Sequence, residues 1–423
     1  MKVLIIGSGG REHAIIKSLK KNTKISKIYA APGNGGISID AECVPIKAVD
    51  IQSMTDFAVE NSIDYVVVAP DDPLALGMVD ALEAKGIRCF GPNKAAARIE
   101  SSKIFAKDLM KKYNIPTASY ETFHIADEAQ DFINSENTKF PLVIKADGLA
   151  LGKGVVIAND RMEAQQTIMD FMMEKKFGES GKSIVIEEFL TGPEVSVLAF
   201  TDGKTVKPMI SSMDHKRAFD DNIGPNTGGM GVIAPNPHYK KNIAAICEKT
   251  IFLPTIHAMR EEGCPFKGCL YFGLILTPQG PKVIEYNCRF GDPEAQAVLS
   301  LLETDLLEIM QAVTDEKLEN IDISWHPAGA ACIILASGGY PSVYETGLEI
   351  TGLNKDGGTN DCVIFHSGTT YKDGCFFTAG GRVLGVTSIA STLENALITA
   401  YYTVENINFD KKHYRTDIGS YRS

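Results

Sequence analysis

Short apolar runs alternate with amphipathic stretches along the first hundred residues. The runs at residues 2–6, 28–31, 65–69 and 88–90 have the length of buried strands, and the segments between them carry helical spacing. Short strands that alternate with helices of about 10–15 residues are typical of a parallel, doubly wound α/β sheet. A Gly-Pro-Asn turn at residues 91–93 is expected to end it.

Beyond residue 95 the pattern changes. It predicts a basic helix over residues 101–112 and then strands, at 141–145, 155–158, 183–186 and 194–200. Helical sequence around 241–260 precedes two apolar runs, 269–277 and 282–287, whose Pro-Gln-Gly link predicts a hairpin. After residue 325 the chain is strand-rich, with Gly-Gly turns and a final helix near 393–406.

Length and composition add limits to this pattern. The 423 residues suggest roughly three domains at about 150 residues each, and a chain that is 44% hydrophobic and 22% charged is an ordinary folded protein. No apolar run reaches the roughly 18 residues of a membrane helix, and the N-terminal run stops too early for a signal peptide. A net charge of −11 disfavours nucleic acid as a partner. Nine scattered cysteines without a Cys-x-x-Cys pair favour buried thiols in a reducing cytoplasm.

A glycine-rich turn follows the first expected strand. Gly7-x-Gly9-Gly10 resembles a dinucleotide fingerprint, but Glu12 stands at the third glycine position and no acid ends the second strand. An NAD-dependent oxidoreductase is therefore disfavoured. The turn presents backbone N–H groups at a helix N-terminus, where a phosphate monoester is favoured and Arg11 adds a bidentate donor. A purely structural tight turn is the alternative.

Residues 147–154 form a second glycine loop between two strands. Its three glycines and Lys153 suit a flap that closes over polyphosphate, although this is not a Walker A sequence. Lys145 precedes it among apolar strand neighbours, so its ammonium group must reach solvent or an anion. Each lysine alone is better explained by a surface position, whereas the two lysines together with the glycines predict a phosphate clamp.

Residues 184–190 followed by Glu194 are typical of a hinge between two lobes. Backbone groups there can pair with an adenine edge, and the acid can bind ribose hydroxyls; two adjacent strands with solvated glutamates are the alternative. On a later strand, Glu285 and Asn287 are two residues apart and share a face, so their oxygens suit Mg²⁺. A solvated strand face is the competing interpretation, and the charges of Arg289, Asp292 and their neighbours favour the site.

Two further segments combine donors with glycines. Residues 214–217 supply donors and residues 226–229 supply donors and glycines, and residues 378–382 repeat the pattern with less specificity. His215 is a candidate metal ligand or general base, but a loop-bonding histidine explains it better. No Ser-His-Asp order or Gly-x-Ser-x-Gly elbow is present, so a covalent hydrolase is not supported.

Taken in order, these segments resemble the glycinamide ribonucleotide synthetase family of the ATP-grasp superfamily. The matching stretches run from the first strand almost to the C-terminus, at residues 3–13, 31–36, 143–154, 185–190, 214–217, 224–231, 283–294, 380–382 and 415–419. The resemblance implies an N-terminal parallel-sheet domain over residues 1–100, an ATP-grasp domain over 101–324 with a hinged subdomain at about 121–190, and a small α+β C-terminal domain over 325–423. It implies ligation of glycine to 5-phosphoribosylamine with ATP and Mg²⁺, or Mn²⁺ as an alternative ion, in purine synthesis. A monomer, with a transient partner that channels the short-lived amine, is expected.

The resemblance also assigns residues to these ligands. Lys103, Lys145, Gly152, Lys153 and Gly154 would contact phosphates, the hinge (Glu187, Glu188, Phe189, Leu190) would hold adenine, Glu194 the ribose, and Glu285 with Asn287 the metal. Arg289, Asp214 and Lys153 are the expected catalytic residues, with Arg289 on the glycine carboxylate or a nearby phosphate. The expected substrate-binding residues are Gly9, Gly10, Arg11, Asn34, Asp214, Lys216, Asn226, Thr227, Gly228, Gly229, Arg289, Gly291, Asp292 and Arg382.

The chain departs from the family pattern at Asp71-Asp72, where relatives usually carry a longer acid, and contacts near the sugar phosphate are in question there. Three rival functions remain: another ATP-grasp ligase of the carboxylase type, the NAD-dependent oxidoreductase, and a nucleotide-binding module without turnover.

Overall fold

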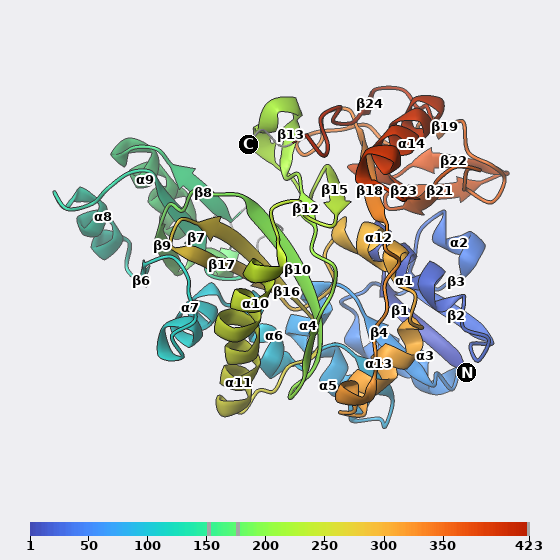
Figure 1. Ribbon diagram of the computed structural model, residues 1–423, viewed down its shortest axis with the longest axis horizontal. Helices are drawn as coiled ribbons and strands as arrows, with labels where there is room; N and C mark the ends of the chain where they lie inside the picture. The colour runs from blue at the N-terminus through green and yellow to red at the C-terminus, as the bar shows by residue number, and fades with distance from the viewer. Residues whose placement is uncertain (150–153, 175–177, 421–423) are drawn as a thin grey trace.

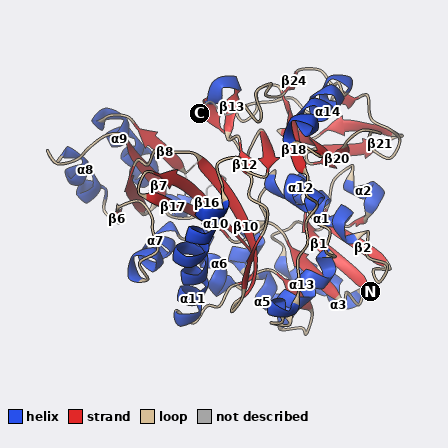
Figure 2. Ribbon diagram, in the orientation of Figure 1, coloured by secondary structure: helices blue, strands red, loops and turns tan. Residues whose placement is uncertain are grey.

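The structure of the chain, a computed structural model, describes residues 1–149, 154–174 and 178–420. Its N-terminal part is a five-stranded parallel sheet in the order β3-β2-β1-β4-β5. The strands are β1 (Lys2–Gly7), β2 (Lys27–Pro32), β3 (Glu42–Cys43), β4 (Tyr65–Val68) and β5 (Arg88–Phe90). Helices cover both faces of the sheet, as Figure 2 shows, so the predicted doubly wound sheet is confirmed.

The central strand explains this two-sided cover. Val3 and Ile5 of β1 belong to one hydrophobic core, whereas Leu4 and Ile6 belong to another, because alternate residues of a strand face opposite sides. The helices of this part are α1 (Gly10–Leu19), α2 (Ile37–Asp40), α3 (Ile51–Glu60), α4 (Asp71–Leu76), α5 (Met78–Glu83), α6 (Lys94–Ser101) and α7 (Lys103–Lys112).

A small antiparallel sheet in the order β6-β9-β7-β8 follows, and it lies at the left end of the molecule in Figure 1. Its own core includes Ile144 and Ile186. Its elements are β6 (Tyr120–Phe123), α8 (Ala126–Asn134), β7 (Leu142–Ala146), β8 (Val155–Ala158), α9 (Arg161–Ile168), a π-helical turn (Met169–Met173), a 3₁₀ turn (Gly178–Gly181) and β9 (Ile184–Glu188).

The facing sheet has the order β11-β10-β16-β17, and its last two strands form the predicted hairpin. A β-bulge at Ile284 interrupts the pairing of these strands. The elements are β10 (Glu194–Asp202), β11 (Val206–Pro208), α10 (Lys241–Cys247), a π-helical turn (Glu248–Phe252), α11 (Leu253–Glu261), β16 (Lys267–Thr277) and β17 (Gly280–Asn287). The hairpin β13 (Arg217–Phe219) and β14 (Ile223–Asn226), with the 3₁₀ turn Asp220–Asn222, stands apart from this sheet.

The C-terminal part is built on a sheet in the order β12-β15-β18-β23-β20, with β24 also paired to β18. It lies against the N-terminal part at the right of Figure 1. A smaller sheet of β19, β22 and β21 covers one end. The elements are β12 (Met213–Asp214), β15 (Gly231–Ala234), α12 (Glu294–Val298), two 3₁₀ turns (Leu299–Leu301 and Leu318–Asn320), α13 (Leu306–Thr314), β18 (Gly329–Ser337), β19 (Glu349–Ile350), β20 (Val363–His366), β21 (Thr369–Lys372), β22 (Cys375–Thr378), β23 (Arg382–Ala390), α14 (Leu393–Asn406) and β24 (Lys412–His413).

Strand β15 links two parts of the molecule, because it pairs with β18 although it lies before residue 325 in the sequence. The loop between β14 and β15 is thereby held beside the C-terminal sheet. The division of the chain at residues 100 and 324 stays a prediction.

Candidate active site

The glycine-rich turn after β1 is filled by the chain's own acids. Glu12 folds back so that its carboxylate accepts a hydrogen bond of 2.6 Å from the Gly9 amide, and Arg11 lies 2.7 Å from the same carboxylate. Arg11 is only 9% exposed and also donates to the Phe290 carbonyl. Asp292 lies 3.5 Å from the Arg11 amide. The end of α1 that was predicted to receive a phosphate therefore already faces two carboxylates.

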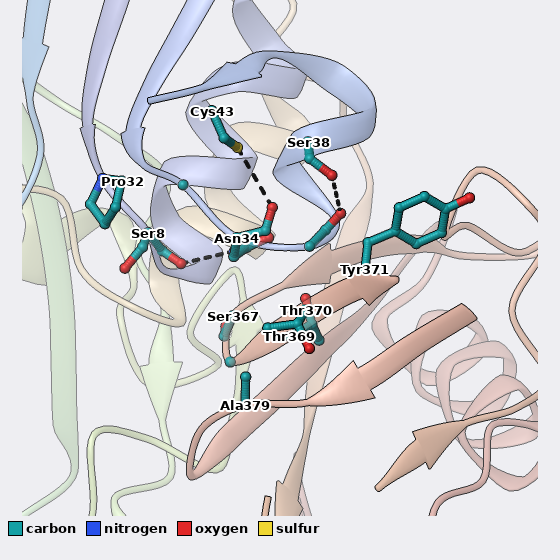
Figure 3. Close-up of a pocket in the computed structure, with 13 residues that line it drawn as sticks. Ser8, Pro32, Asn34, Ser38, Cys43, Ser367, Thr369, Thr370, Tyr371 and Ala379 are labelled. Atoms are coloured by element: carbon teal, nitrogen blue, oxygen red, sulfur yellow. Dashed lines mark hydrogen bonds between the residues drawn. The ribbon is translucent and has the colours of Figure 1, made fainter. Parts of the chain in front are cut away.

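Asn34 connects the N-terminal and C-terminal parts. Its Nδ2 atom donates to the carbonyls of Ser8 and His366, each at 2.8 Å, and its Oδ1 atom accepts from the Ile37 amide at the start of α2. These bonds border a pocket of about 470 Å³ between the two parts, lined on the other side by residues 367–371 and Ala379 (Figure 3). Gly10 lies beside it, since a Cβ there would approach the buried Ser367 hydroxyl to 2.7 Å. The lining is polar and uncharged.

Lys103 is placed by the cap of α7. The Ser102 hydroxyl accepts from the Phe105 amide and donates to Asp147, whose carboxylate also accepts from the Ile104 amide at 3.1 Å. A carboxylate is stabilised at this end of a helix. The Lys103 ammonium donates to the Gly148 carbonyl at 2.7 Å, and burial together with Lys145 lowers the pKa of Lys103.

Lys145 and Glu187 meet across the small sheet. The Lys145 ammonium lies 2.9 Å from Oε1 of Glu187 and donates to the Ile284 carbonyl at the bulge of β17, also at 2.9 Å. Glu187 is 2% exposed, and its second oxygen lies 2.8 Å from the ammonium of Lys107. Both carboxylate oxygens of Glu187 thus pair with lysines, which leaves only its backbone groups for a ligand at the hinge.

Only part of the remaining predicted nucleotide clamp lies within the described residues. Gly152 and Lys153 lie outside the described residues, whereas the Gly154 carbonyl accepts from the Ala146 amide at 2.9 Å. The hinge follows β9 on the other side. Glu188 is exposed and accepts hydrogen bonds from the Ser119 amide and from Lys282. Phe189 and Leu190 follow β9 in the connecting segment, and Glu194 begins β10.

Glu285 and Asn287 share the cleft face of β17 with a lysine beside them. Lys216 lies 3.0 Å from Glu285, and it lowers the pKa of Glu285 to about 2 against the effect of burial, with Lys145 and Lys103 contributing. The carboxylate is therefore ionised at neutral pH. The side-chain amide oxygen of Asn287, Oδ1, accepts a long hydrogen bond of 3.4 Å from Arg289.

Arg289 lies between two acids. Its Nη2 atom is 3.2 Å from buried Glu100 and 4.0 Å from Asp71, and its buried Nε atom has no hydrogen-bond partner among the described residues. Burial raises the pKa of Asp71, but Arg289 and Arg11 outweigh it and hold that pKa below its usual value. The shorter acid at position 71 therefore still interacts with Arg289.

Asp214 and Glu294 form a second acidic pair. Burial and Glu294 together raise the pKa of Asp214 well above its usual value. The Oδ1 atom of Asp214 is buried, and no hydrogen bond reaches it from the described chain. Gly229 lies against this oxygen, where an added Cβ would come within 2.6 Å. Asp214 is consequently placed to exchange a proton or to accept a hydrogen bond from a ligand amine.

Arg382 holds the loops around this pair. Its Nη1 atom donates to the carbonyls of Gly228 and Asp292, each at 2.7 Å, and its Nη2 atom lies 3.3 Å from the Asp292 carboxylate. Thr227 fastens the same loop by donating to the Lys216 carbonyl, whereas Asn226 is exposed at the end of β14. Gly291 lies against Glu294, where an added Cβ would be 2.3 Å from its carboxylate.

His215 has the loop-bonding role that the sequence favoured. Its Nδ1 atom donates to the Gly231 carbonyl at 3.2 Å and its Nε2 atom accepts from the Gly419 amide at 3.2 Å. Both ring nitrogens are therefore used by the backbone.

Two buried charged residues near these groups were not predicted from the sequence: Lys107 and Glu100. Lys107 is four residues after Lys103, so both lie on one face of α7, and this spacing was an available signal. Glu100 reaches Arg289 from a distant segment, and its spacing gave no comparable signal. Glu294, whose charge was counted among those beside the metal strand, is the acid that acts on Asp214.

The described ranges contain neither a membrane-spanning helix nor a preformed group of metal ligands. Over residues 1–149, 154–174 and 178–420, no helix is long and apolar enough to cross a membrane. In the same part of the chain, no three His, Cys, Asp or Glu side chains converge as a metal-binding group. A metal at Glu285 and Asn287 would need further oxygen ligands from a nucleotide or water.

Comparison with protein families gives matches along nearly the whole chain. Residues 1–100, 101–295 and 330–421 match the N domain, the ATP-grasp (A) domain and the C domain of phosphoribosylglycinamide synthetase. A phosphoribosylamine–glycine ligase from Caldanaerobacter subterraneus subsp. tengcongensis is 47% identical over 99% of this chain and 100% of its own length. A trifunctional purine biosynthetic protein from Gallus gallus is also 47% identical over 99% of the chain, which spans 42% of that protein.

Solved structures give the same picture. A phosphoribosylamine–glycine ligase from Thermotoga maritima superposes with a TM-score of 0.87 at 32% identity, over 99% of this chain and 100% of that one. A biotin carboxylase domain from Hydrogenobacter thermophilus, at 15% identity and a TM-score of 0.74 over 97% of this chain and 91% of that one, shares the fold alone. The fold class predicted from the sequence is confirmed, and the chain belongs to the phosphoribosylglycinamide synthetase family of ATP-grasp ligases.

Proposed function

We propose that the chain ligates glycine to 5-phosphoribosylamine, with conversion of ATP to ADP and phosphate, in purine synthesis. The observation that carries the proposal is the convergence of Lys103, Lys145 and Glu285 from α7, β7 and β17 on one cleft, in a chain of this family. Two cations face an ionised carboxylate there, which is the charge pattern that a nucleotide polyphosphate with a divalent ion requires.

The nucleotide lies between the small sheet and the β10–β17 sheet in this proposal. Lys103 and Lys145 contact phosphate oxygens, and so do Gly152, Lys153 and Gly154. The backbone of Glu188, Phe189 and Leu190 pairs with the adenine edge, because the side chain of Glu187 is already engaged by lysines. Glu194 binds the ribose.

Glu285 and Asn287 fit a magnesium ion, because an ionised carboxylate and an amide oxygen are hard oxygen donors. The same donors accept Mn²⁺, which is proposed as an alternative ion. A bound divalent ion supplies neutralisation of the charge that develops on the transferred phosphoryl group. Lys216, whose ammonium lies 3.0 Å from Glu285, would contact the substrates beside such an ion.

Glycine binds beside the acidic pair. Arg289 receives its carboxylate through the unpartnered Nε atom, and Asp214 accepts a hydrogen bond from its amine. Thr227, Gly228, Gly229, Gly291 and Asp292 shape this subsite, with Asn226 at its edge.

The sugar phosphate lies toward the pocket between the N-terminal and C-terminal parts. Asn34 lines that pocket, and Gly10 lies beside it against Ser367, with Gly9 before it in the turn. Arg11 and Arg382 supply positive charge from behind the loops that they fasten. Phosphate binding at the Gly9 amide requires the Glu12 carboxylate, which now accepts from that amide, to give up this hydrogen bond.

The reaction consists of two displacements. A carboxylate is a poor acyl donor, so a glycine carboxylate oxygen attacks the γ-phosphorus of ATP, and the bond to the β-phosphate oxygen breaks to release ADP. The ribosylamine nitrogen then attacks the acyl carbon of glycyl phosphate, phosphate leaves, and the amine proton passes to Asp214 or water. Positioning and exclusion of water are the main tasks of the protein, since no covalent intermediate with a side chain is needed.

Several accompanying proposals concern the chain's surroundings. All nine cysteines are free thiols, which supports a reducing cytoplasmic location. A monomer is proposed, together with a transient partner that delivers phosphoribosylamine, and the fusion of purine-synthesis activities named in the chicken relative supports such proximity. Nucleic acid and membranes are not proposed as partners.

The test is phosphate release from ATP and Mg²⁺ by the purified chain. Release that requires both glycine and phosphoribosylamine supports the proposal. Release with bicarbonate in place of glycine would instead indicate a carboxylase-type ligase, and ATP binding without release would indicate a nucleotide-binding module.

A further inference from the structure

Lys107 is a buried cation that the proposed reaction does not use. It is 2% exposed on α7, one turn after Lys103, and its ammonium lies 2.8 Å from Oε2 of Glu187. It also donates to the Thr117 hydroxyl at 2.8 Å, which in turn donates to the Val283 carbonyl of β17. Lys107 is therefore fixed to both sheets that border the nucleotide cleft.

The other carboxylate oxygen of Glu187, Oε1, lies 2.9 Å from the ammonium of Lys145. Lys145 is 7% exposed, and its ammonium also donates to the Ile284 carbonyl. An ammonium group has three N–H donors, so one remains for a ligand. Its field reaches Lys103 and Glu285, whose pKa values it lowers. Lys145 thus acts on the groups proposed to contact the nucleotide phosphates.

The charges of this group do not cancel. Two lysines and one glutamate leave one net positive charge, and Lys107 supplies one of the two positive charges that pair with Glu187. Burial lowers the pKa of Lys107 to about 8, against the effect of Glu187, so Lys107 still carries its proton at neutral pH. Without that charge, Glu187 would be compensated by Lys145 alone, and the field that Lys145 presents to an anion would weaken.

We propose that Lys107 is a positioning residue for nucleotide binding: it holds Glu187 from the far side, so that Lys145 keeps positive charge for the phosphates of ATP. The inference rests on the proposed function, since it assumes that this cleft binds ATP. It predicts an effect on the polyphosphate that the base and ribose do not share, because Lys107 lies behind Glu187 and not against the ligand.

The experiment measures binding of the non-hydrolysable analogue AMP-PNP with Mg²⁺, and of adenosine, by calorimetry on the full chain. Lys107→Gln is expected to weaken AMP-PNP binding about tenfold or more, and adenosine binding less than about threefold. Lys111→Gln is the matched control, because Lys111 is exposed on the same helix. Its ammonium lies 5.6 Å from the centroid of the Tyr120 ring, which Lys107 also approaches. This control should bind both ligands as the unchanged protein does.

The decisive variant is the double substitution Lys107→Gln with Glu187→Gln. It removes one charge of each sign and returns Lys145 to its original net charge, so AMP-PNP affinity should recover to within about threefold of the unchanged protein. A Lys107 that only stabilised the fold would show no such recovery, and thermal unfolding of each variant records that contribution separately. Unchanged AMP-PNP binding in Lys107→Gln, or a double variant as weak as the single one, overturns the inference. An unchanged protein that binds no AMP-PNP overturns the proposed function instead.

Discussion

The ammonium group of Lys216 lies 3.0 Å from the carboxylate of Glu285 on β17. This contact keeps Glu285 ionised and places a cation where the proposed divalent ion would bind. Lys216 follows β12, which pairs with β15 and through it with β18, so the position of Lys216 depends on the C-terminal sheet.

Glu285→Gln should raise the Mg²⁺ concentration for half-maximal phosphate release about tenfold, because a neutral amide replaces the one carboxylate of the proposed metal pair. The measurement is a magnesium titration at saturating substrates. Glu60→Gln, at an exposed position at the end of α3, is the control and should leave the titration unchanged. An identical titration for Glu285→Gln would remove this residue from the metal site.

Arg289→Ala should raise the glycine KM at least tenfold, since the proposed partner of the glycine carboxylate is lost. It should also destabilise the protein by about 3 kcal/mol, because Glu100 is left buried without its counter-ion. Arg289→Lys keeps the charge and loses the fork, so it should raise the glycine KM with a smaller loss of stability. A folded Arg289→Lys with an unchanged glycine KM contradicts the assignment.

Asn34→Asp tests the connection between the N-terminal and C-terminal parts. The carboxylate cannot donate to the carbonyls of Ser8 and His366, so the free energy of unfolding should fall by about 2–4 kcal/mol in a denaturant titration. Asn360→Asp is the matched control, because Asn360 acts as an acceptor through Oδ1, which aspartate retains. Equal stability of the two variants would show that the Asn34 bonds contribute little.

His13 predicts acid-sensitive stability. Its Nδ1 atom accepts from the His366 amide, so Nε2 carries the proton and donates to Asp40, and burial with Lys17 lowers the pKa of His13 to about 4. Between pH 6.5 and 4 the unfolded chain binds a proton that the folded chain does not. Stability therefore falls as the pH falls through this window, by up to about 3 kcal/mol for one such group, and this term becomes constant below pH 4.

Replacing His13 with Gln removes that term. His13→Gln should be less stable than the parent at pH 7 but should lose less stability between pH 6.5 and 4. The remaining slope reflects His215 and His366, whose pKa values burial also lowers, to about 4 and about 3. Denaturant titrations at several pH values measure it, and an unchanged slope in His13→Gln contradicts the prediction.

Local patterns were sufficient for most elements of the fold. The apolar runs predicted β1, β4, β8 and the β16–β17 hairpin within a few residues, and the spacing after residue 392 predicted α14. These elements are set by burial of alternating or helically spaced residues, and that information lies within each segment.

Contacts between distant segments limited the prediction of the site. Asn34 bonds to His366, 332 residues away, and no local pattern encodes that bond. Arg11 was expected to meet phosphate, but Glu12 next to it and Phe290 far from it occupy its guanidinium. The pairing of Lys107 with Glu187 depends on how α7 packs against β9, which the sequence pattern does not specify.

The central claim is that glycine is activated as an acyl phosphate before the amine attacks it. The most direct measurement is a turnover with glycine labelled with ¹⁸O in its carboxylate, ATP, Mg²⁺ and freshly formed phosphoribosylamine, followed by mass analysis of the inorganic phosphate. The account predicts phosphate that forms only with both substrates and carries one labelled oxygen for each amide formed. Unlabelled phosphate, or phosphate released without regard to glycine and the amine, would contradict it.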